Sequence, residues 1–272
     1  MRTILLYIHD DDCFEARLQV ALDLCRQYDG HLTCLQAVPY NQGIATDFYY
    51  PVVTQVVTDL REAAKEVRDQ IEPRLASEDI AWDWIYSDGF ASRQISRYAP
   101  LCELIVLGAH NQVGSAQHPS SLVSDVVSQV RAPILVVPAS TKCLSLDALA
   151  VVAWNGSPEG AHALRAATSM LSRASQVQIL TVREQQDAER PDLLPTDAAK
   201  YLARHGIEAE IVELASDGKL STAEILSQAA EIRKAAYLVM GAFGHSRFRE
   251  RILGGVTRDM LTNPKTPLLL SH

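Results

Sequence analysis

Glycines and arginines gather in one segment near the end of the chain. Three glycines follow the spacing Gly-x2-Gly-x9-Gly, and four arginines stand against two acids in the same segment, a local charge of +2; the glycines are Gly241, Gly244 and Gly254, and the charged residues are Arg247, Arg249, Arg251, Arg258, Glu250 and Asp259. Glycines let backbone amides approach a ligand closely, and a helix N-terminus adds unpaired N–H donors. The segment therefore predicts an anion-binding cradle suited to phosphate.

A plainer interpretation of these residues stays open. Gly241 could simply end a strand, Gly254 and Gly255 could form a tight turn before a helix, and the arginines could be a solvated face. A glycine pattern by itself is a weak signal. The choice between the two interpretations depends on the strands and helices predicted on either side of the segment.

Composition narrows the class of protein. The chain has 272 residues, 47% of them hydrophobic, which is enough for one large domain or two small ones. A formal net charge of -8 argues against general binding to nucleic acids or to anionic membranes. The first residues lack the pattern of a signal peptide, no segment approaches the length of a membrane span, and the five cysteines are scattered. We expect reduced thiols in a cytoplasmic protein.

The chain repeats itself. The run that ends at Val38 resembles the run that ends at Val182, an offset of 182 − 38 = 144, and the run that ends at Gly108 resembles the run that ends at Gly241, an offset of 241 − 108 = 133. Short apolar runs alternate with helical patterns, as in parallel strands covered by helices on both faces. The sequence predicts an α/β fold: two doubly wound, mainly parallel five-stranded sheets flanked by helices, paired as an internal pseudo-dimer.

The glycine spacing, followed by a small residue, resembles the nucleotide-binding signature of the universal stress proteins. The order of strands and helices in each copy, together with the duplication, resembles tandem members of that family over essentially the whole chain. The resemblance implies a degenerate domain over residues 1–140 and a domain with the nucleotide-binding signature over residues 147–272. It also implies a stress-response regulatory protein that binds ATP or ADP, with or without Mg2+.

The resemblance assigns ligand contacts to particular positions. For the base and ribose they are the first-strand end, the second-strand end and the residue before the first glycine; for the phosphates they are the third glycine and the two residues after it. The predicted site residues are Ala153, Asn155, Val182, Met240, Gly241, Gly244, His245, Arg247, Gly254, Gly255, Val256 and Thr257.

Two positions depart from the family pattern. Gly255 stands where the family usually has Ser or Thr, so a hydroxyl donor is lost, and Thr257 is expected to replace it. Asn155 stands where the family usually has Asp; it can still hydrogen-bond a ribose but carries no charge. Each change is expected to weaken binding by on the order of 1 kcal/mol, about the net worth of one hydrogen bond.

The first copy departs further. By the 133-residue offset, Ser121 takes the third glycine position and Leu122 the small-residue position, where its side chain would crowd a phosphate. Asp10, Asp11 and Asp12 follow the first strand, with Asp11 opposite Asn155, and three acids at the ligand edge would repel a polyphosphate. This copy is expected to lack ordinary ATP binding.

Two other functions remain open beside nucleotide binding. One is a slow ATPase or nucleotidyl-transfer enzyme, for which Glu250 and Asp259 are the acids at hand in the signature segment. The other is a ligand-free dimerisation or adaptor protein. We expect no catalytic residues, no metal site and no nucleic-acid or membrane partner; the protein partner stays unspecified, and the two domains pair within the chain, with a homodimer open.

Overall fold

The structure is a computed structural model. It describes residues 1–38, 50–109, 120–183, 193–216, 218–242 and 254–272, and the side chains of residues 50–55 are not included. Among these residues, no helix is long and apolar enough to cross a membrane.

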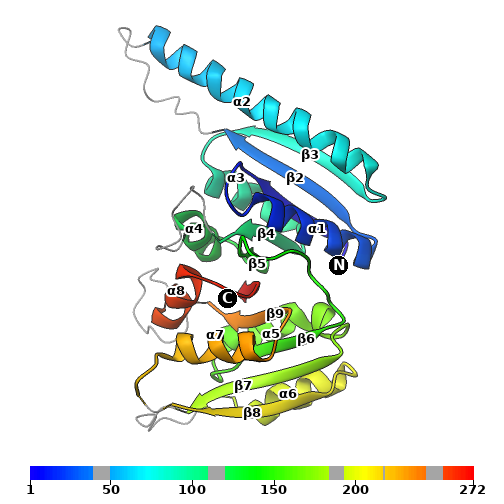
Figure 1. Cartoon of the computed structure of the whole chain (residues 1–272), viewed down its shortest axis with the longest axis vertical. Helices are drawn as coiled ribbons and strands as arrows, with labels where there is room; N and C mark the ends of the chain where they lie inside the picture. The colour runs from blue at the N-terminus through cyan, green and yellow to red at the C-terminus, as the bar shows by residue number, and fades with distance from the viewer. Residues whose placement is uncertain (39–49, 110–119, 184–192, 217, 243–253) are drawn as a thin grey trace.

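The N-terminal half holds five strands separated by helices (Figure 1). Its elements are β1 (Thr3–Ile8), α1 (Phe14–Tyr28), β2 (His31–Val38), α2 (Tyr50–Ser77), β3 (Ala81–Asp88), α3 (Ala91–Tyr98), the short 3-10 helix η1 (Ala99–Leu101), β4 (Leu104–Gly108), α4 (Ser121–Gln129) and β5 (Ile134–Val137).

The C-terminal half repeats this order. Its elements are β6 (Leu149–Ala153), α5 (Pro158–Leu171), β7 (Gln176–Arg183), α6 (Pro195–Arg204), β8 (Ala209–Ala215), α7 (Thr222–Ile232), β9 (Tyr237–Gly241), α8 (Gly255–Thr262) and β10 (Leu268–Ser271). The alternation of short apolar runs with helical patterns therefore predicted the elements correctly.

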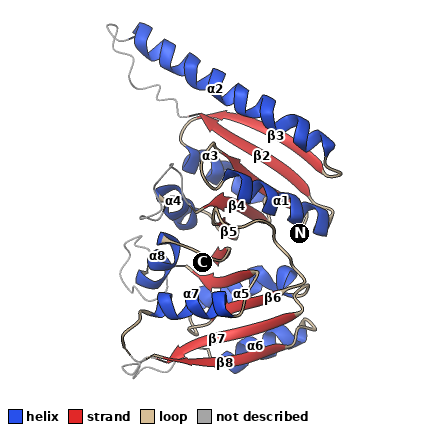
Figure 2. Cartoon of the chain, viewed as in Figure 1, coloured by secondary structure: helices blue, strands red, loops and turns tan. Residues whose placement is uncertain are grey.

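The two halves join edge to edge into one ten-stranded sheet, in the order β3-β2-β1-β4-β5-β10-β9-β6-β7-β8 (Figure 2). Strands within each half are parallel, whereas β5 and β10 are antiparallel, with Leu135 opposite Leu269 at the centre of the seam. An antiparallel pair between equivalent strands relates the halves by a local two-fold axis. The predicted α/β class and the internal pairing are confirmed, and the two five-stranded arrays form a single sheet.

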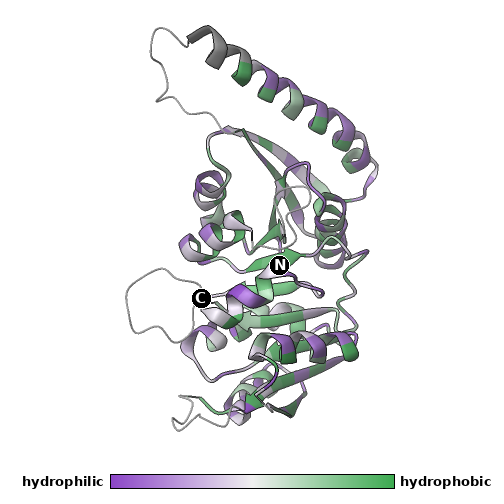
Figure 3. Ribbon diagram, turned by 60° about the vertical axis from the view of Figure 1, so that its left-hand side comes forward, coloured by the Kyte–Doolittle hydropathy of each residue, from purple (hydrophilic) through white to green (hydrophobic). Residues whose placement is uncertain are grey.

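Each face of the sheet carries one apolar layer that spans both halves. Helices α1, α2, α5 and α6 cover one face, and α3, α4, α7 and α8 cover the other. Figure 3 shows apolar residues concentrated along the strands, with polar residues on the outer sides of the helices. The strands are short and buried on both faces, which is why they appear in the sequence as continuous apolar runs rather than alternating ones.

The segment between the halves packs onto the N-terminal half. Leu144 and Leu146 are buried, and the Leu144 N–H donates to Asp23 Oδ2 of α1 at 2.9 Å. Across the seam, the Tyr28 hydroxyl at the end of α1 donates to the Ser169 carbonyl of α5 at 2.8 Å. The halves therefore share a core as well as a strand pair.

Candidate functional site

In the C-terminal half the chain reverses its winding at β6. This strand lies between β9 and β7, and the chain leaves it through α5 to reach β7 on one side, whereas β9 lies on the other. Helix α5 covers one face of the sheet there, and α7 and α8 cover the other. The carboxyl ends of β6 and β9 thus mark the switch point, the position at which open α/β sheets bind ligands.

Asn155 and Gly241 meet around the first turn of α5. Asn155 Oδ1 accepts the Ser157 N–H at 3.1 Å, and the Ser157 hydroxyl accepts the Gly160 N–H at 3.1 Å, which caps the helix. A methyl group added at Gly241 would lie 2.6 Å from the backbone nitrogen of Gly160, and one added at Gly160 would lie 3.1 Å from Asn155 Oδ1. The absence of a side chain at Gly241 is therefore required by close packing of β9 against α5.

Helix α8 begins at a residue that has no side chain to cap it. Gly254 is the N-cap residue, with φ -56° and ψ 148°, and no side chain in the described part of the chain accepts a hydrogen bond from the first turn. The first helical hydrogen bond runs from the Arg258 N–H to the Gly254 carbonyl at 2.9 Å, which leaves the amides of Gly255, Val256 and Thr257 as donors without a helical acceptor. These amides are the positive end of the helix dipole.

The described residues leave space beside Gly255 at the start of α8. Gly255 is exposed, and a methyl group added there would meet no heavy atom of the described structure within 4 Å. Val256 is 36% exposed. Thr257, by contrast, is 4% exposed and lies on the same helix face as Met260 and Leu261, which pack on the sheet. This placement argues against the expectation that the Thr257 hydroxyl replaces the one missing at Gly255.

The remaining predicted residues fall into two groups. Ala153 and Val182 are half-buried near the ends of the paired strands β6 and β7, and Met240 is 5% exposed with its side chain in the core. The structure therefore places residues from three adjacent strand ends along one edge. Gly244, His245 and Arg247 lie outside the described residues, as does Glu250.

The equivalent helix of the N-terminal half is capped by its own side chain. The Val123 N–H donates to Ser120 Oγ at 3.3 Å at the start of α4, and Ser120 is buried. The hydroxyl thus accepts a hydrogen bond from the third amide of the first turn. In α8 the corresponding amide, that of Thr257, has no such acceptor at Gly254.

The 133-residue alignment is wrong by one residue at this helix. The distance from Gly108 to the N-cap Ser120 is 120 − 108 = 12 residues, whereas the distance from Gly241 to the N-cap Gly254 is 254 − 241 = 13. The buried residues agree, since Val123, Val126 and Val127 of α4 correspond to Thr257, Met260 and Leu261 of α8. Ser120 therefore takes the place of the third glycine and Ser121 that of Gly255.

This correction moves Leu122 away from the small-residue position. Leu122 is 7% exposed and packs into the core, so its side chain is directed away from the first-turn amides. The expectation that it would crowd a phosphate is wrong. The N-terminal half differs from the C-terminal half through the Ser120 cap instead.

Asp11 is equivalent to Asn155, as expected, but its carboxylate is already engaged. Asp11 Oδ1 accepts the Cys13 N–H at 2.8 Å, the same i to i+2 bond that Asn155 makes with Ser157. The Arg17 guanidinium lies 2.5 Å from the same oxygen, and both side chains are almost fully buried. The expectation of three acids repelling a polyphosphate is therefore wrong for Asp11, whose charge Arg17 balances.

Two residues beside the site were not anticipated. The Leu193 N–H donates to the Gly156 carbonyl at 3.1 Å, and the Leu193 carbonyl accepts the Trp154 indole N–H at 3.2 Å. Leu193 and the following Leu194 are 38% and 50% exposed. The sequence holds little signal for them beyond two leucines before Pro195, because main-chain hydrogen bonds determine where they lie.

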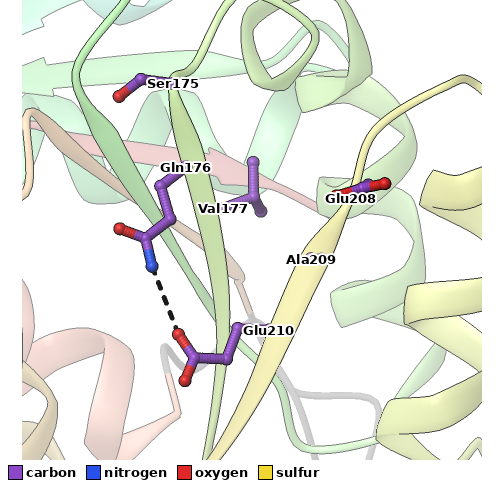
Figure 4. Close-up of a pocket in the computed structure, with 6 residues that line it drawn as sticks. All are labelled: Ser175, Gln176, Val177, Glu208, Ala209 and Glu210. Atoms are coloured by element: carbon purple, nitrogen blue, oxygen red, sulfur yellow. Dashed lines mark hydrogen bonds between the residues drawn. The ribbon is translucent and has the colours of Figure 1, made fainter.

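A recess elsewhere on the C-terminal half is separate from this site. It is lined by Ser175, Gln176, Val177, Glu208, Ala209 and Glu210 (Figure 4). These residues begin strands β7 and β8, so the recess lies at the amino ends of the strands. Ligands of doubly wound sheets bind at the opposite edge. Among the described residues, no group of three or more His, Cys, Asp or Glu side chains could hold a metal ion.

The fold defines a duplicated α/β protein with a topological switch point in its C-terminal half. Residues 150–272 match the model of the universal stress protein family. These residues, the C-terminal half of the chain, are therefore similar in sequence to the universal stress protein family. No curated protein matches the chain.

Solved structures extend the similarity in fold to both halves. A universal stress protein from Archaeoglobus fulgidus is 16% identical with a TM-score of 0.75, over 98% of this chain and 97% of that one. A putative universal stress protein from Pseudomonas aeruginosa is 15% identical with a TM-score of 0.62, over 100% of this chain and 93% of that one. A shorter match, 23% identical over 47% of this chain and 99% of that one with a TM-score of 0.32, is a universal stress protein in complex with cAMP.

Proposed function

We propose that the C-terminal half, residues 147–272, binds an adenine nucleotide, ATP or ADP with or without Mg2+, and that the protein acts as a stress-response regulator rather than as an efficient enzyme. The observation that carries this proposal is the start of α8 at Gly254, where no side chain of the described residues caps the first turn and a methyl group added at Gly255 would meet no described atom within 4 Å. Uncapped amides at a helix N-terminus favour phosphate through both hydrogen bonds and the helix dipole.

The polar groups around the start of α5 support the same ligand. Asn155 is exposed beside Gly241, at the end of the strand where the sheet reverses its winding. Its Oδ1 accepts the Ser157 N–H, so its amide N–H2 is the group directed to a ligand hydroxyl. A ribose hydroxyl accepting from Asn155 and phosphates on the α8 amides would use both sides of the switch point.

The N-terminal half, residues 1–140, is proposed not to bind a nucleotide in this way. Ser120 caps α4 and Arg17 engages Asp11, so the two groups equivalent to the α8 amides and to Asn155 already have partners. We therefore expect one nucleotide per chain. We also propose that the protein works in the cytoplasm, and that any homodimer forms outside the seam between the halves.

A charge placed at Gly255 tests the proposal. Gly255→Asp puts a carboxylate among the first-turn amides of α8, and Gly255→Asn puts a neutral group of the same shape there. An acid in the first turn stabilises a helix by about 0.3–1 kcal/mol, so the Asp variant should fold at least as well as the wild type while its carboxylate repels phosphate.

Isothermal titration calorimetry with ATP, ADP, AMP and cAMP provides the measurement. We expect one site per chain in the wild type, retained binding in Gly255→Asn and a loss of at least about tenfold in Gly255→Asp, which corresponds to 1.4 kcal/mol. Absence of heat with every nucleotide, or equal binding by both variants, would contradict the proposal. A stoichiometry of two would contradict the assignment to the C-terminal half alone.

A further inference from the structure

Leu193 is fixed to the turn that carries Asn155. Its N–H donates to the Gly156 carbonyl at 3.1 Å, and its carbonyl accepts the Trp154 indole N–H at 3.2 Å. Asn155 lies between these two partners in the chain. Trp154 is itself buried, and its backbone N–H donates to the Leu180 carbonyl of β7 at 2.8 Å. The backbone of Leu193 is therefore held next to the ligand edge.

Leu194 is held equally firmly. It is the N-cap residue of α6, and its N–H donates to the Asp197 carboxylate at 3.1 Å in the reverse arm of a capping box. Pro195 follows at the first helical position, where its fixed φ suits the helix. Two consecutive leucines are thus preorganised at the carboxyl end of β7, although both have large exposed surfaces.

Ligand sites combine apolar walls with a few placed polar groups. Most of the other exposed groups described at this switch point are polar or small, such as the Asn155 amide, Gly255 and the first-turn amides of α8. They suit the ribose and phosphates of a nucleotide. The apolar residues there offer a base less surface than two exposed leucines, because Val182 is half-buried, Met240 is 5% exposed and Val256 is 36% exposed.

We propose that Leu193 and Leu194 form the apolar wall against which the base of the bound nucleotide packs. The proposal rests on the proposed nucleotide-binding function and assigns the base-binding part of that site. Burying the flat face of a purine against two fixed leucine side chains removes apolar surface from water with little loss of conformational freedom. Because the main chain fixes both residues, their side chains can be replaced without releasing the segment.

Leu193→Asn and Leu194→Asn, alone and together, test the wall. Both retain the main-chain hydrogen bonds to Gly156, Trp154 and Asp197, and circular dichroism and melting temperature check the fold. Ile232→Asn is the matched control, because Ile232 is 79% exposed at the end of α7. Leu193→Met with Leu194→Met keeps the surface apolar and should bind as the wild type does.

ATP and inorganic tripolyphosphate serve as the two probes in calorimetry. We expect the double Asn variant to bind ATP at least about tenfold more weakly while its affinity for tripolyphosphate is unchanged, and Ile232→Asn to match the wild type with both probes. Trp154 gives a second readout in a Trp82→Phe, Trp84→Phe background, where it is the one tryptophan of the three that remains. ATP should change its fluorescence more than tripolyphosphate does.

The outcomes distinguish a failure of the apolar wall from a failure of the proposed nucleotide binding. Equal ATP affinity in the wild type and the double Asn variant, with binding lost in Gly255→Asp, would overturn the wall and leave nucleotide binding standing. Equal losses for ATP and tripolyphosphate would also overturn the wall, because the effect would then lie at the phosphates. Absence of ATP binding by the wild type would overturn both.

Discussion

Asp11 and Arg17 form an ion pair of 2.5 Å whose side chains are 2% and 1% exposed. The Arg17 guanidinium also donates to the Tyr7 carbonyl at 2.9 Å and to the His9 carbonyl, so it crosses the end of β1. By the 144-residue offset, the corresponding residues of the C-terminal half are Asn155 and Ala161. At these two positions the N-terminal half therefore carries both charges and the C-terminal half carries neither.

The first prediction concerns this pair. Arg17→Met should lower the free energy of unfolding by about 3–5 kcal/mol, because it leaves the Asp11 carboxylate buried without its partner. The double variant Asp11→Asn, Arg17→Met should recover part of the loss, since it repeats the neutral arrangement of the other half. Urea denaturation of both single variants and the double variant measures the coupling energy. Additive losses would show that the two side chains act independently.

The second prediction concerns Gly241. Gly241→Ala would bring a methyl group to 2.6 Å from the backbone atoms of Glu159 and Gly160, so β9 or α5 has to move. We expect a loss of about 1–3 kcal/mol in unfolding free energy, the range for overpacking. Gly255→Ala is the matched control, because no atom of the described structure lies within 4 Å of the added methyl group. Equal melting temperatures for the two variants would contradict the close packing.

The third prediction adds a hydroxyl to the phosphate side of the proposed site. Gly255→Ser supplies the donor that the family pattern usually has there, in space that is open in the described structure. We expect ATP to bind several-fold more tightly, since one hydrogen bond contributes about 1 kcal/mol. Calorimetry against Gly255→Ala separates the hydroxyl from the added carbon. An affinity equal to that of the Ala variant would exclude a phosphate contact at this position.

The fourth prediction concerns pH. Burial lowers the pKa of His272, and the nearby His162 and Arg131 lower it further, whereas Glu159 acts in the opposite direction. The unfolded chain then binds more protons than the folded chain at His272 between its depressed folded pKa and the unfolded value of about 6.5. The unfolding free energy should therefore fall as the pH drops through this window.

Thermal unfolding at a series of pH values from 7.5 to 5 checks this expectation, with about half-unit steps around the unfolded pKa of histidine. His272→Gln should show a shallower loss of melting temperature on acidification than the wild type. The antiparallel register, with Leu270 opposite Ile134, brings His272 to the chain just before β5, close to Arg131. Parallel curves for the two proteins would mean that His272 does not contribute to the pH dependence.

Sequence patterns were sufficient for the fold because both copies keep the same buried runs. The run Leu104–Gly108 and the run Tyr237–Gly241 are buried β-strands, and the offset between them holds at Gly108 and Gly241. The offset changes by one residue before the next helix, at Ser120 and Gly254, and nothing in a comparison of two short polar segments reveals a single insertion.

Parts of the site could not be predicted, for separate physical reasons. Arginine is rarely buried, so no pattern marks Arg17 as fully buried, and its pairing with Asp11 depends on how α1 crosses the sheet. Leu193 is positioned by its main chain, and backbone hydrogen bonds leave no trace in residue types. Asn155, in contrast, could be found, because its side chain makes the Asx-type turn that its residue type favours.

The antiparallel junction of β5 with β10 determines which strand edges remain for pairing with a second molecule. That junction pairs one edge strand of each half, so the unpaired strand edges in the described part of the chain are those of β3 and β8, at opposite ends of the sheet. Joining like edges of two molecules would close a dimer, whereas joining β3 of one molecule to β8 of the next would propagate without end. The fusion of two halves thus removes the central edge from assembly and leaves two outer ones with different side chains.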